Sequence, residues 1–326
     1  MKQTGYSQSP PIIKEFLGYL GTVKGKSPLT VEEYFMDLRT FFRYMKLHRG
    51  AVAPQTPFEE ITIDDINIEF IKSITLTDVY EYMNFVSTQR KNKASTRSRK
   101  VSSLRAYFQY LTNKVGKLEH NPVQELETPK TKKSLPKYLT LEQSVRLLAA
   151  INGPYQTRDY CIITLFLNCG MRLSELVGIN LSDVNHKEHV MRITGKGNKE
   201  RLVYLNEACM NAIQAYLKDR PTDRVIDKEA LFISREHKRI SPKTVQFLVN
   251  KYLRKIGLGG PGYSVHKLRH TAATLMYQHG NVDIRVLKDI LGHENLGTTE
   301  IYTHISDEQM EKASKANPLS KIKPAK

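Results

Sequence analysis

The sequence of 326 residues lacks long apolar runs, and its few cysteines show no metal-binding spacing. Its longest apolar run, CIITLFLNC, covers residues 161–169, whereas a membrane-spanning helix needs about 20 residues. The three cysteines are odd in number and have no CxxC spacing, which excludes a disulfide framework and a zinc knuckle. The first residues, MKQTGYSQSPP, lack the apolar segment of a signal peptide. We therefore expect a reducing, cytoplasmic setting and no membrane partner.

Acidic residues are also scarce. The chain has 50 Lys and Arg against 33 Asp and Glu, a formal net charge of +17, and no acidic residue lies between Glu81 and Glu119. Such an excess favours a polyanionic partner, because each neutralised phosphate releases condensed counterions. A basic proteome would raise the total charge as well, but an evenly solvated surface would mix the two signs. The clustering predicts a DNA-binding element, to which we assign Arg90, Lys91, Lys93, Arg97, Arg99, Lys100 and Arg105.

The chain is long enough for two domains. Its first third is helical by pattern, since apolar residues recur at helical spacing in LTVEEYFMDLRTFFRYMK, where Thr30 is the expected N-cap. The stretch Asn121–Thr140 is rich in proline and lysine, which is typical of an interdomain linker. We predict an N-terminal helical domain over residues 1–125, a linker over 126–137 and a second domain over 138–326.

The second domain has a mixed pattern. HVMRITGKGNKERLVYL alternates apolar and polar residues around a glycine-rich turn, which is typical of a β-hairpin. Helical periodicity surrounds it, with Ser241 as a cap, Ser264 at a helix start and Gly292 at a helix end. The predicted fold class is mainly α with a small antiparallel β-sheet.

Three segments place a cation or an imidazole beside a turn or a helix end. GMRLSELVG carries Arg172, and TGKGNKERL carries Lys196 between two glycines; taken alone, both are more often surface residues. SVHKLRHTA puts His266, Arg269 and His270 on one face of a helix near its N-terminus, an end that attracts anions. The HxxxH spacing also suits zinc, but the glutamate of H-E-x-x-H is absent and basic residues stand between the histidines. Phosphate fits this cluster better than a metal ion does.

These side chains are suited to phosphoryl transfer. Two arginines can bind the non-bridging oxygens of a phosphate bidentately, histidines exchange protons near neutral pH, and a lysine can act as a general acid. A tyrosine such as Tyr302 can then be the nucleophile, because nearby cations acidify its phenol and a covalent ester can form. The other interpretation of Tyr302 is an ordinary half-buried aromatic.

Five motifs lie in order between residues 170 and 305: GMRLSELVGI, GKGNKER, HKLRHTAAT, LGHENLGTT and IYTHI. They resemble the signature boxes of the tyrosine recombinases, also called the phage-integrase family, and are most similar to those of the Xer-type site-specific recombinases. The N-terminal region is similar, more loosely, to the SAM-like core-binding domain of this family, although residues 50–74 form a longer connection than usual. The resemblance implies a C-terminal catalytic domain that cuts and rejoins DNA through a 3′-phosphotyrosyl intermediate.

The resemblance also implies a role for each matching residue. Tyr302 would attack the scissile phosphate, Arg172 and Arg269 would hold this phosphate, and Lys196 would protonate the leaving 5′-oxygen. Because the tyrosyl ester conserves the energy of the phosphodiester, the reaction would need no metal and no other cofactor.

Four further residues match the family in supporting or catalytic positions. His266 would assist proton transfer from the nucleophile, and His293 would bond a non-bridging oxygen. Glu175 would orient an arginine, although an exposed helical glutamate is the ordinary alternative, and His270 would be a supporting residue.

The implied partner is a double-stranded DNA recombination site, bound by a homo- or hetero-tetramer with one protomer per half-site. A second recombinase or a DNA translocase would complete the system. We predict Xer-like resolution of chromosome dimers, with integration of a mobile element as the alternative. Two other classes stay open: a non-catalytic DNA-binding protein, and a type IB topoisomerase with the same catalytic residues.

Overall fold

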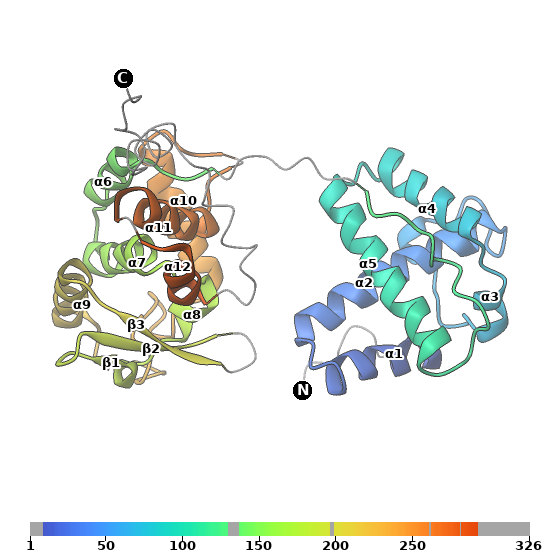
Figure 1. Cartoon of the computed structure of the whole chain (residues 1–326), viewed down its shortest axis with the longest axis horizontal. Helices are drawn as coiled ribbons and strands as arrows, with labels where there is room; N and C mark the ends of the chain where they lie inside the picture. The colour runs from blue at the N-terminus through green and yellow to red at the C-terminus, as the bar shows by residue number, and fades with distance from the viewer. Residues whose placement is uncertain (1–8, 130–136, 196–198, 261, 281, 293–326) are drawn as a thin grey trace, which may run out of the picture. The chain divides into compact units, whose positions relative to one another are not determined.

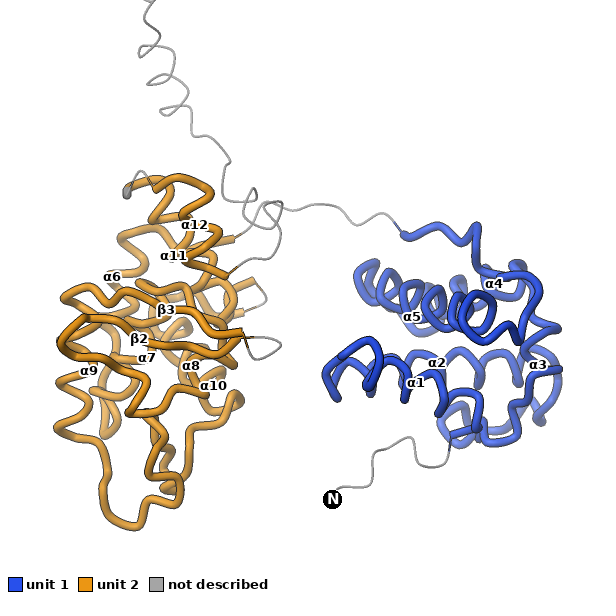
Figure 2. Tube along the Cα trace, turned by 60° about the horizontal axis from the view of Figure 1, so that its bottom comes forward, with its two compact units in different colours: residues 1–133 blue, residues 134–326 orange. Residues whose placement is uncertain are grey.

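A computed structural model describes residues 9–129, 137–195, 199–260, 262–280 and 282–292 of the chain. The polypeptide divides into two compact units, residues 1–133 and 134–326 (Figure 2). Each unit has its own hydrophobic core. Within the described ranges, no helix is both long and apolar enough to cross a membrane. The predicted fold class, mainly helical with a small antiparallel sheet, is confirmed.

The first unit is a bundle of helices (Figure 1). Aromatic rings join its helices: the ring of Phe41 lies 5.1 Å from that of Tyr82 and 6.2 Å from that of Phe108, both edge-on. Edge-to-face contacts of this kind add to the stabilisation from apolar burial. The elements are α1 (Pro11–Thr22), α2 (Pro28–His48), the 3-10 turn η1 (Phe58–Glu60), α3 (Ile68–Lys72), α4 (Leu76–Thr88) and α5 (Ala94–Asn113).

The start of α2 differs from the prediction. Ser27, not Thr30, is the N-cap, and its side-chain oxygen accepts a hydrogen bond from the Thr30 main-chain N at 3.2 Å. Pro28 occupies the first helical position, where its missing N–H has no cost and its fixed φ suits a helix. The helix therefore begins at Pro28, three residues before the start predicted from Thr30 as the N-cap.

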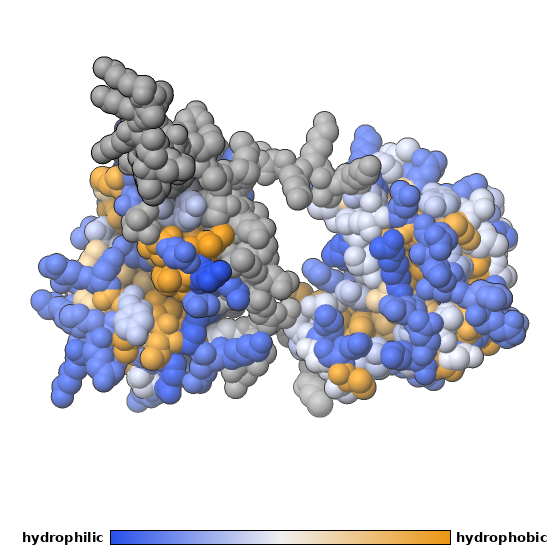
Figure 3. Space-filling view, viewed as in Figure 1, coloured by the Kyte–Doolittle hydropathy of each residue, from blue (hydrophilic) through white to orange (hydrophobic). Residues whose placement is uncertain are grey.

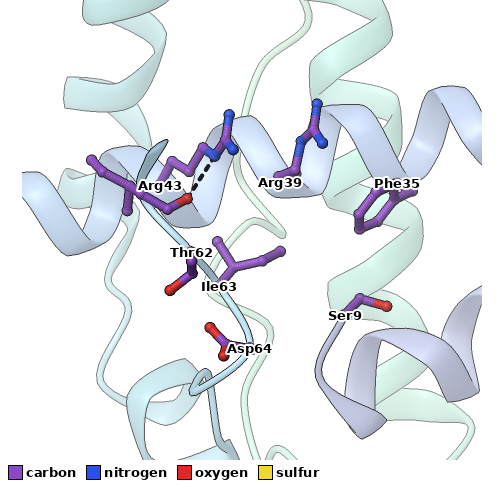
Figure 4. A pocket seen from close by; sticks show the side chains of 8 residues that line it. Ser9, Phe35, Arg39, Arg43, Thr62, Ile63 and Asp64 are labelled. Carbon is purple, nitrogen blue, oxygen red and sulfur yellow. Dashed lines mark hydrogen bonds between the residues drawn. The ribbon is translucent and has the colours of Figure 1, made fainter. Parts of the chain in front are cut away.

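The connection over residues 50–74 is packed structure tied to α2. Arg43 donates from Nε to the Ile61 carbonyl at 2.8 Å, and Lys46 donates from Nζ to the Thr62 carbonyl at 3.1 Å. Such donors satisfy main-chain carbonyls that have no ladder partner. A cavity of about 520 Å³ remains between α2 and residues 61–64, with Arg39 and Arg43 along the helix side (Figure 4).

The start of the predicted linker is also packed. Val123 and Leu126 are buried, at 0% and 1% exposure, within the core of the first unit. Arg105 of α5 donates to the Leu126 carbonyl and, at 3.1 Å, to Thr128 Oγ1. The described residues up to Thr128 are therefore an irregular segment that the first unit holds against α5, whereas most of the predicted linker lies outside the described residues.

The second unit is a helical domain with a three-stranded antiparallel sheet of order β1-β2-β3. The β2–β3 hairpin forms as predicted, with Met191 opposite Val203 and Ile193 opposite Arg201. Figure 1 shows the helices gathered on one side of this sheet. The elements are α6 (Leu141–Ala149), α7 (Gln156–Cys169), α8 (Leu173–Gly178), the 3-10 turn η2 (Leu181–Asp183), β1 (Val184–Asn185), β2 (Val190–Thr194), β3 (Glu200–Tyr204), α9 (Glu207–Asp219), α10 (Pro242–Lys255), α11 (Val265–Gly280) and α12 (Ile284–Leu291).

Candidate active site

The turn from α7 to α8 positions Arg172. Gly170 ends α7 in the left-handed conformation with φ 58°, and a Cβ there would lie 2.7 Å from Leu291 Cδ2 of α12. Only glycine combines this backbone angle with so close an approach. The tight turn makes Arg172 the N-cap residue of α8 and points it toward the end of α12.

Glu175, on the first turn of α8, contacts Arg172 at two points. Its Oε2 accepts from the Arg172 main-chain N and its Oε1 from Arg172 Nη1, both at 2.7 Å. The Glu175 side chain is fully buried. The ordinary alternative, an exposed helical glutamate, is therefore wrong, because the carboxylate faces a cluster of arginines.

Two more arginines complete this cluster. Arg201 of β3 donates to both oxygens of Glu175, with Nη1–Oε1 at 2.8 Å and Nη2–Oε2 at 3.0 Å. Arg269 of α11 brings its Nη1 to 3.9 Å from Glu175 Oε2. Three guanidinium groups thus surround one carboxylate, which leaves an excess of two positive charges. Such an excess suits the binding of an anion.

The surrounding arginines keep Glu175 ionised. Burial by itself would raise the pKa of this carboxyl, but the hydrogen bonds from Arg201 and from the Arg172 main chain outweigh burial and lower the pKa to about 2. The hydrogen bonds stabilise the charged form because all their donors point at the carboxylate oxygens. Glu175 is therefore a permanent anion at any pH at which the protein would work.

Arg172 and Arg269 also hold the C-terminal end of α12. Arg269 donates to the carbonyls of Gly170 at 2.7 Å and Leu291 at 2.6 Å, and Arg172 donates from Nη2 to the Gly292 carbonyl at 2.8 Å. The last carbonyls of a helix carry partial negative charge, so cations bind there favourably. Gly292 ends α12 in the left-handed conformation, as predicted.

The two histidines of α11 have different surroundings. His266 is exposed, whereas His270 is partly buried one turn further on. Burial, together with the charges of Lys267, His266 and Arg269, lowers the pKa of His270 to about 4. His270 is therefore a neutral imidazole at neutral pH.

The structure brings Arg269 of α11 to Arg172 and Glu175, which are themselves only three residues apart at the start of α8. Three other predicted site residues, Lys196, His293 and Tyr302, lie outside the described residues. Their nearest described neighbours are Gly195, whose main-chain N donates to the Lys199 carbonyl at 2.7 Å, and Gly292.

Arg201 is a residue of this cluster that the sequence analysis did not predict. It lies within the GKGNKER motif, but the sequence pattern gave it no role. A signal was present, since β3 places Arg201 on the same side as the buried Val203, and an inward-facing arginine needs a counter-charge.

The basic residues assigned to DNA binding have different environments. Lys91 and Lys93 are exposed at the start of α5. Arg90 pairs with Glu59 at 3.0 Å, Arg97 donates to the Asn92 carbonyl at 2.9 Å, and Arg105 holds the Leu126 carbonyl.

Lys100 faces the inside of the bundle instead, and the partly exposed Arg99 binds the same buried carboxylate. Asp37 of α2 is buried and accepts from Arg99, from Lys100 Nζ at 3.0 Å and from Ser103 Oγ at 2.8 Å. Only 8% of the Lys100 side chain is exposed, against 39% for Arg99. A buried ion pair with Asp37 therefore explains Lys100, which contradicts its assignment to a DNA-facing surface.

An apolar groove lies on the second unit. Figure 3 shows apolar surface where β3 and α12 approach each other. The groove has a volume of about 420 Å³, and its apolar lining includes Leu202, Tyr204, Val286 and Ile290. Leu202 and Tyr204 are exposed because they occupy the outward positions of β3.

Comparisons with known proteins agree on the family of this chain. Residues 137–309 match the phage integrase family. The chain is 55% identical over 311 residues to tyrosine recombinase XerC of Caldanaerobacter subterraneus subsp. tengcongensis, covering 95% of this chain and 88% of that protein. It is 35% identical to tyrosine recombinase XerC of Thermodesulfovibrio yellowstonii, covering 95% and 97%.

A solved structure supports the fold. The crystal structure of XerH site-specific recombinase bound to difH substrate, a pre-cleavage complex, superposes with a TM-score of 0.67. The match covers 93% of this chain and 84% of that chain at 21% sequence identity.

Proposed function

The chain belongs to the phage integrase family of tyrosine recombinases, and on this premise we propose that the arginine cluster around Glu175 binds the scissile phosphate during site-specific DNA recombination. The single observation that carries the proposal is the convergence of Arg172 and Arg269 on one buried carboxylate. A third of the Arg172 side chain is exposed, so it can reach a phosphate while Glu175 holds its inner edge.

Tyr302 is the proposed nucleophile. Its phenol oxygen attacks phosphorus, the bond from phosphorus to the 5′-oxygen breaks, and a 3′-phosphotyrosyl ester forms. His266 takes the phenol proton, and Lys196 gives a proton to the leaving 5′-oxygen. The arginines stabilise the charge that develops on the non-bridging oxygens, with His293 bonded to one of them. A 5′-hydroxyl from a partner strand then reverses these steps and rejoins the DNA.

The assembly that we propose is a tetramer on two duplexes, acting in the cytoplasm with itself or with a second recombinase. Resolution of chromosome dimers is the proposed cellular role, since the relatives named XerC cover almost the whole chain. The apolar groove between β3 and α12 supports contact between protomers, because exposed apolar surface of this kind marks interaction sites.

A trapping experiment tests the chemistry. A nicked suicide half-site should give a covalent protein–DNA complex that survives SDS, in the presence of EDTA, and Tyr302→Phe should give none. Tyr277→Phe, another tyrosine of the second unit, is the matched control and should trap DNA as wild type does. A complex formed by Tyr302→Phe, or a strict metal requirement, would contradict the mechanism.

A two-site assay separates recombination from topoisomerase activity. Wild type should exchange strands between two cognate sites on one plasmid. Relaxation of supercoils without exchange would favour a type IB topoisomerase, and DNA binding without any cleavage would favour a non-catalytic DNA-binding protein.

A further inference from the structure

We propose that Arg201 is a positioning residue of the cleavage site, which holds the Glu175 carboxylate in the orientation that sets Arg172 and the end of α12. The inference deepens the proposed function and rests on it. Arg201 would act through Glu175 and would not touch DNA itself.

The first argument is the geometry of the carboxylate. Each oxygen of Glu175 receives two hydrogen bonds, one from Arg172 and one from Arg201. The Arg201 pair is bidentate, and this fork geometry fixes the plane of a carboxylate as well as its position. Without Arg201, the carboxylate could rotate and carry Arg172 Nη1 with it.

The second argument is the contact with the end of α12. A Cβ at Gly292 would lie 2.9 Å from Arg201 Nη1, 3.1 Å from Cζ and 3.2 Å from Nε. The Arg201 guanidinium therefore packs directly on the residue that precedes His293. Since Arg172 binds the Gly292 carbonyl, both arginines act on the same peptide of the chain.

The third argument excludes a direct contact between Arg201 and DNA. Only 17% of its side chain is exposed, and both of its terminal nitrogens are bound to Glu175. Its Nε is buried and has no hydrogen-bond partner in the described part of the chain. The Arg201 guanidinium is thus less available to a phosphate than that of Arg172, whose side chain is 33% exposed.

A first experiment measures the effect of Arg201 on Glu175 without any DNA. The 13C signal of the Glu175 carboxyl would be titrated by NMR in wild type, Arg201→Met, Arg201→Lys and the control Arg192→Met. Arg192 lies on the neighbouring strand β2, is half exposed and contacts Asp183 at 3.4 Å. We expect the Glu175 pKa to rise in Arg201→Met, because burial then acts against fewer hydrogen bonds, and to stay unchanged in Arg192→Met. An unchanged pKa in Arg201→Met would overturn the inference, whatever the enzyme does.

A second experiment measures cleavage in a single turnover on the suicide half-site. Arg201→Met should slow formation of the covalent complex by about 10- to 100-fold, by analogy with the loss of groups that orient the ligands of a metal site. DNA affinity should change less than about 3-fold, and Arg201→Lys should recover part of the rate because it restores one donor.

The outcomes separate the two proposals. Wild type that forms no covalent complex would contradict the proposed function, while the carboxyl titration would still decide the contact with Glu175. Arg201→Met that weakens DNA binding as much as cleavage would show a direct DNA contact and overturn the positioning role. If Arg192→Met slowed formation of the covalent complex as much as Arg201→Met does, the effect would come from the hairpin as a whole, and the positioning role of Arg201 would also be overturned.

Discussion

Replacing Asp37 tests the interior of the first unit most directly. In Asp37→Ala, Lys100 would lose its counter-ion although only 8% of its side chain is exposed to solvent. Removing one partner of a buried ion pair costs about 3–5 kcal/mol, because the other charge is left uncompensated. Burial already lowers the pKa of Lys100, so its ammonium can release its proton in the variant. We therefore expect Asp37→Ala to lower the free energy of unfolding of the first unit by about 3 kcal/mol, the lower bound of this range.

Calorimetry of the full chain measures this loss. The two units have separate cores, so the transition of the first unit should move to lower temperature while that of the second serves as an internal control. The double variant Asp37→Leu, Lys100→Met should recover most of the stability, because apolar side chains of similar volume can replace a buried ion pair at little cost. Arg99 is 39% exposed and can turn to water.

Two results would refute the reasoning. A loss below about 1 kcal/mol in Asp37→Ala, the range of a surface ion pair, would mean that Lys100 is solvated and available to DNA. If the DNA affinity of the double variant Asp37→Leu, Lys100→Met were much less sensitive to salt than that of wild type, Lys100 would contact a phosphate. Each such contact adds about one to the slope of log affinity against log salt concentration.

Three further predictions concern other parts of the chain. Gly292→Ala should lower the free energy of unfolding by about 1–2 kcal/mol and slow cleavage, because its φ is 62° and its Cβ would meet Arg201 at 2.9 Å; urea unfolding equal to that of wild type would contradict this packing. The second unit should lose stability as pH falls from 6.5 to about 4, since the unfolded His270 binds a proton near 6.5 and the folded one only near 4; in calorimetry at several pH values, His270→Gln should be less sensitive over this window, and an identical profile would count against the assignment. Lys93→Ala should reduce the slope of log affinity against log salt by about one, whereas Lys100→Met should leave it unchanged, and equal slopes in filter binding would remove the distinction between these two lysines.

The sequence by itself determined the elements whose signals are local. The cap at Ser241, the antiparallel pairing of residues 190–194 with 200–204 and the helix end at Gly292 all form as predicted. Each depends on residues within one turn or one strand pair, so a short window contains the whole physical cause. The five motifs likewise predicted the family, which the relatives confirm.

The tertiary structure decided what the charged residues do. Lys100 and Arg201 both appear in basic stretches, but each has its partner carboxylate far away, at Asp37, 63 residues earlier, and at Glu175, 26 residues earlier. No helical or strand period links such positions, and a buried charge takes its role from whichever counter-charge the fold brings within hydrogen-bond distance. The convergence of Arg172, Arg201 and Arg269 on Glu175 has the same origin, because α8, β3 and α11 must be packed before the three arginines can meet this carboxylate.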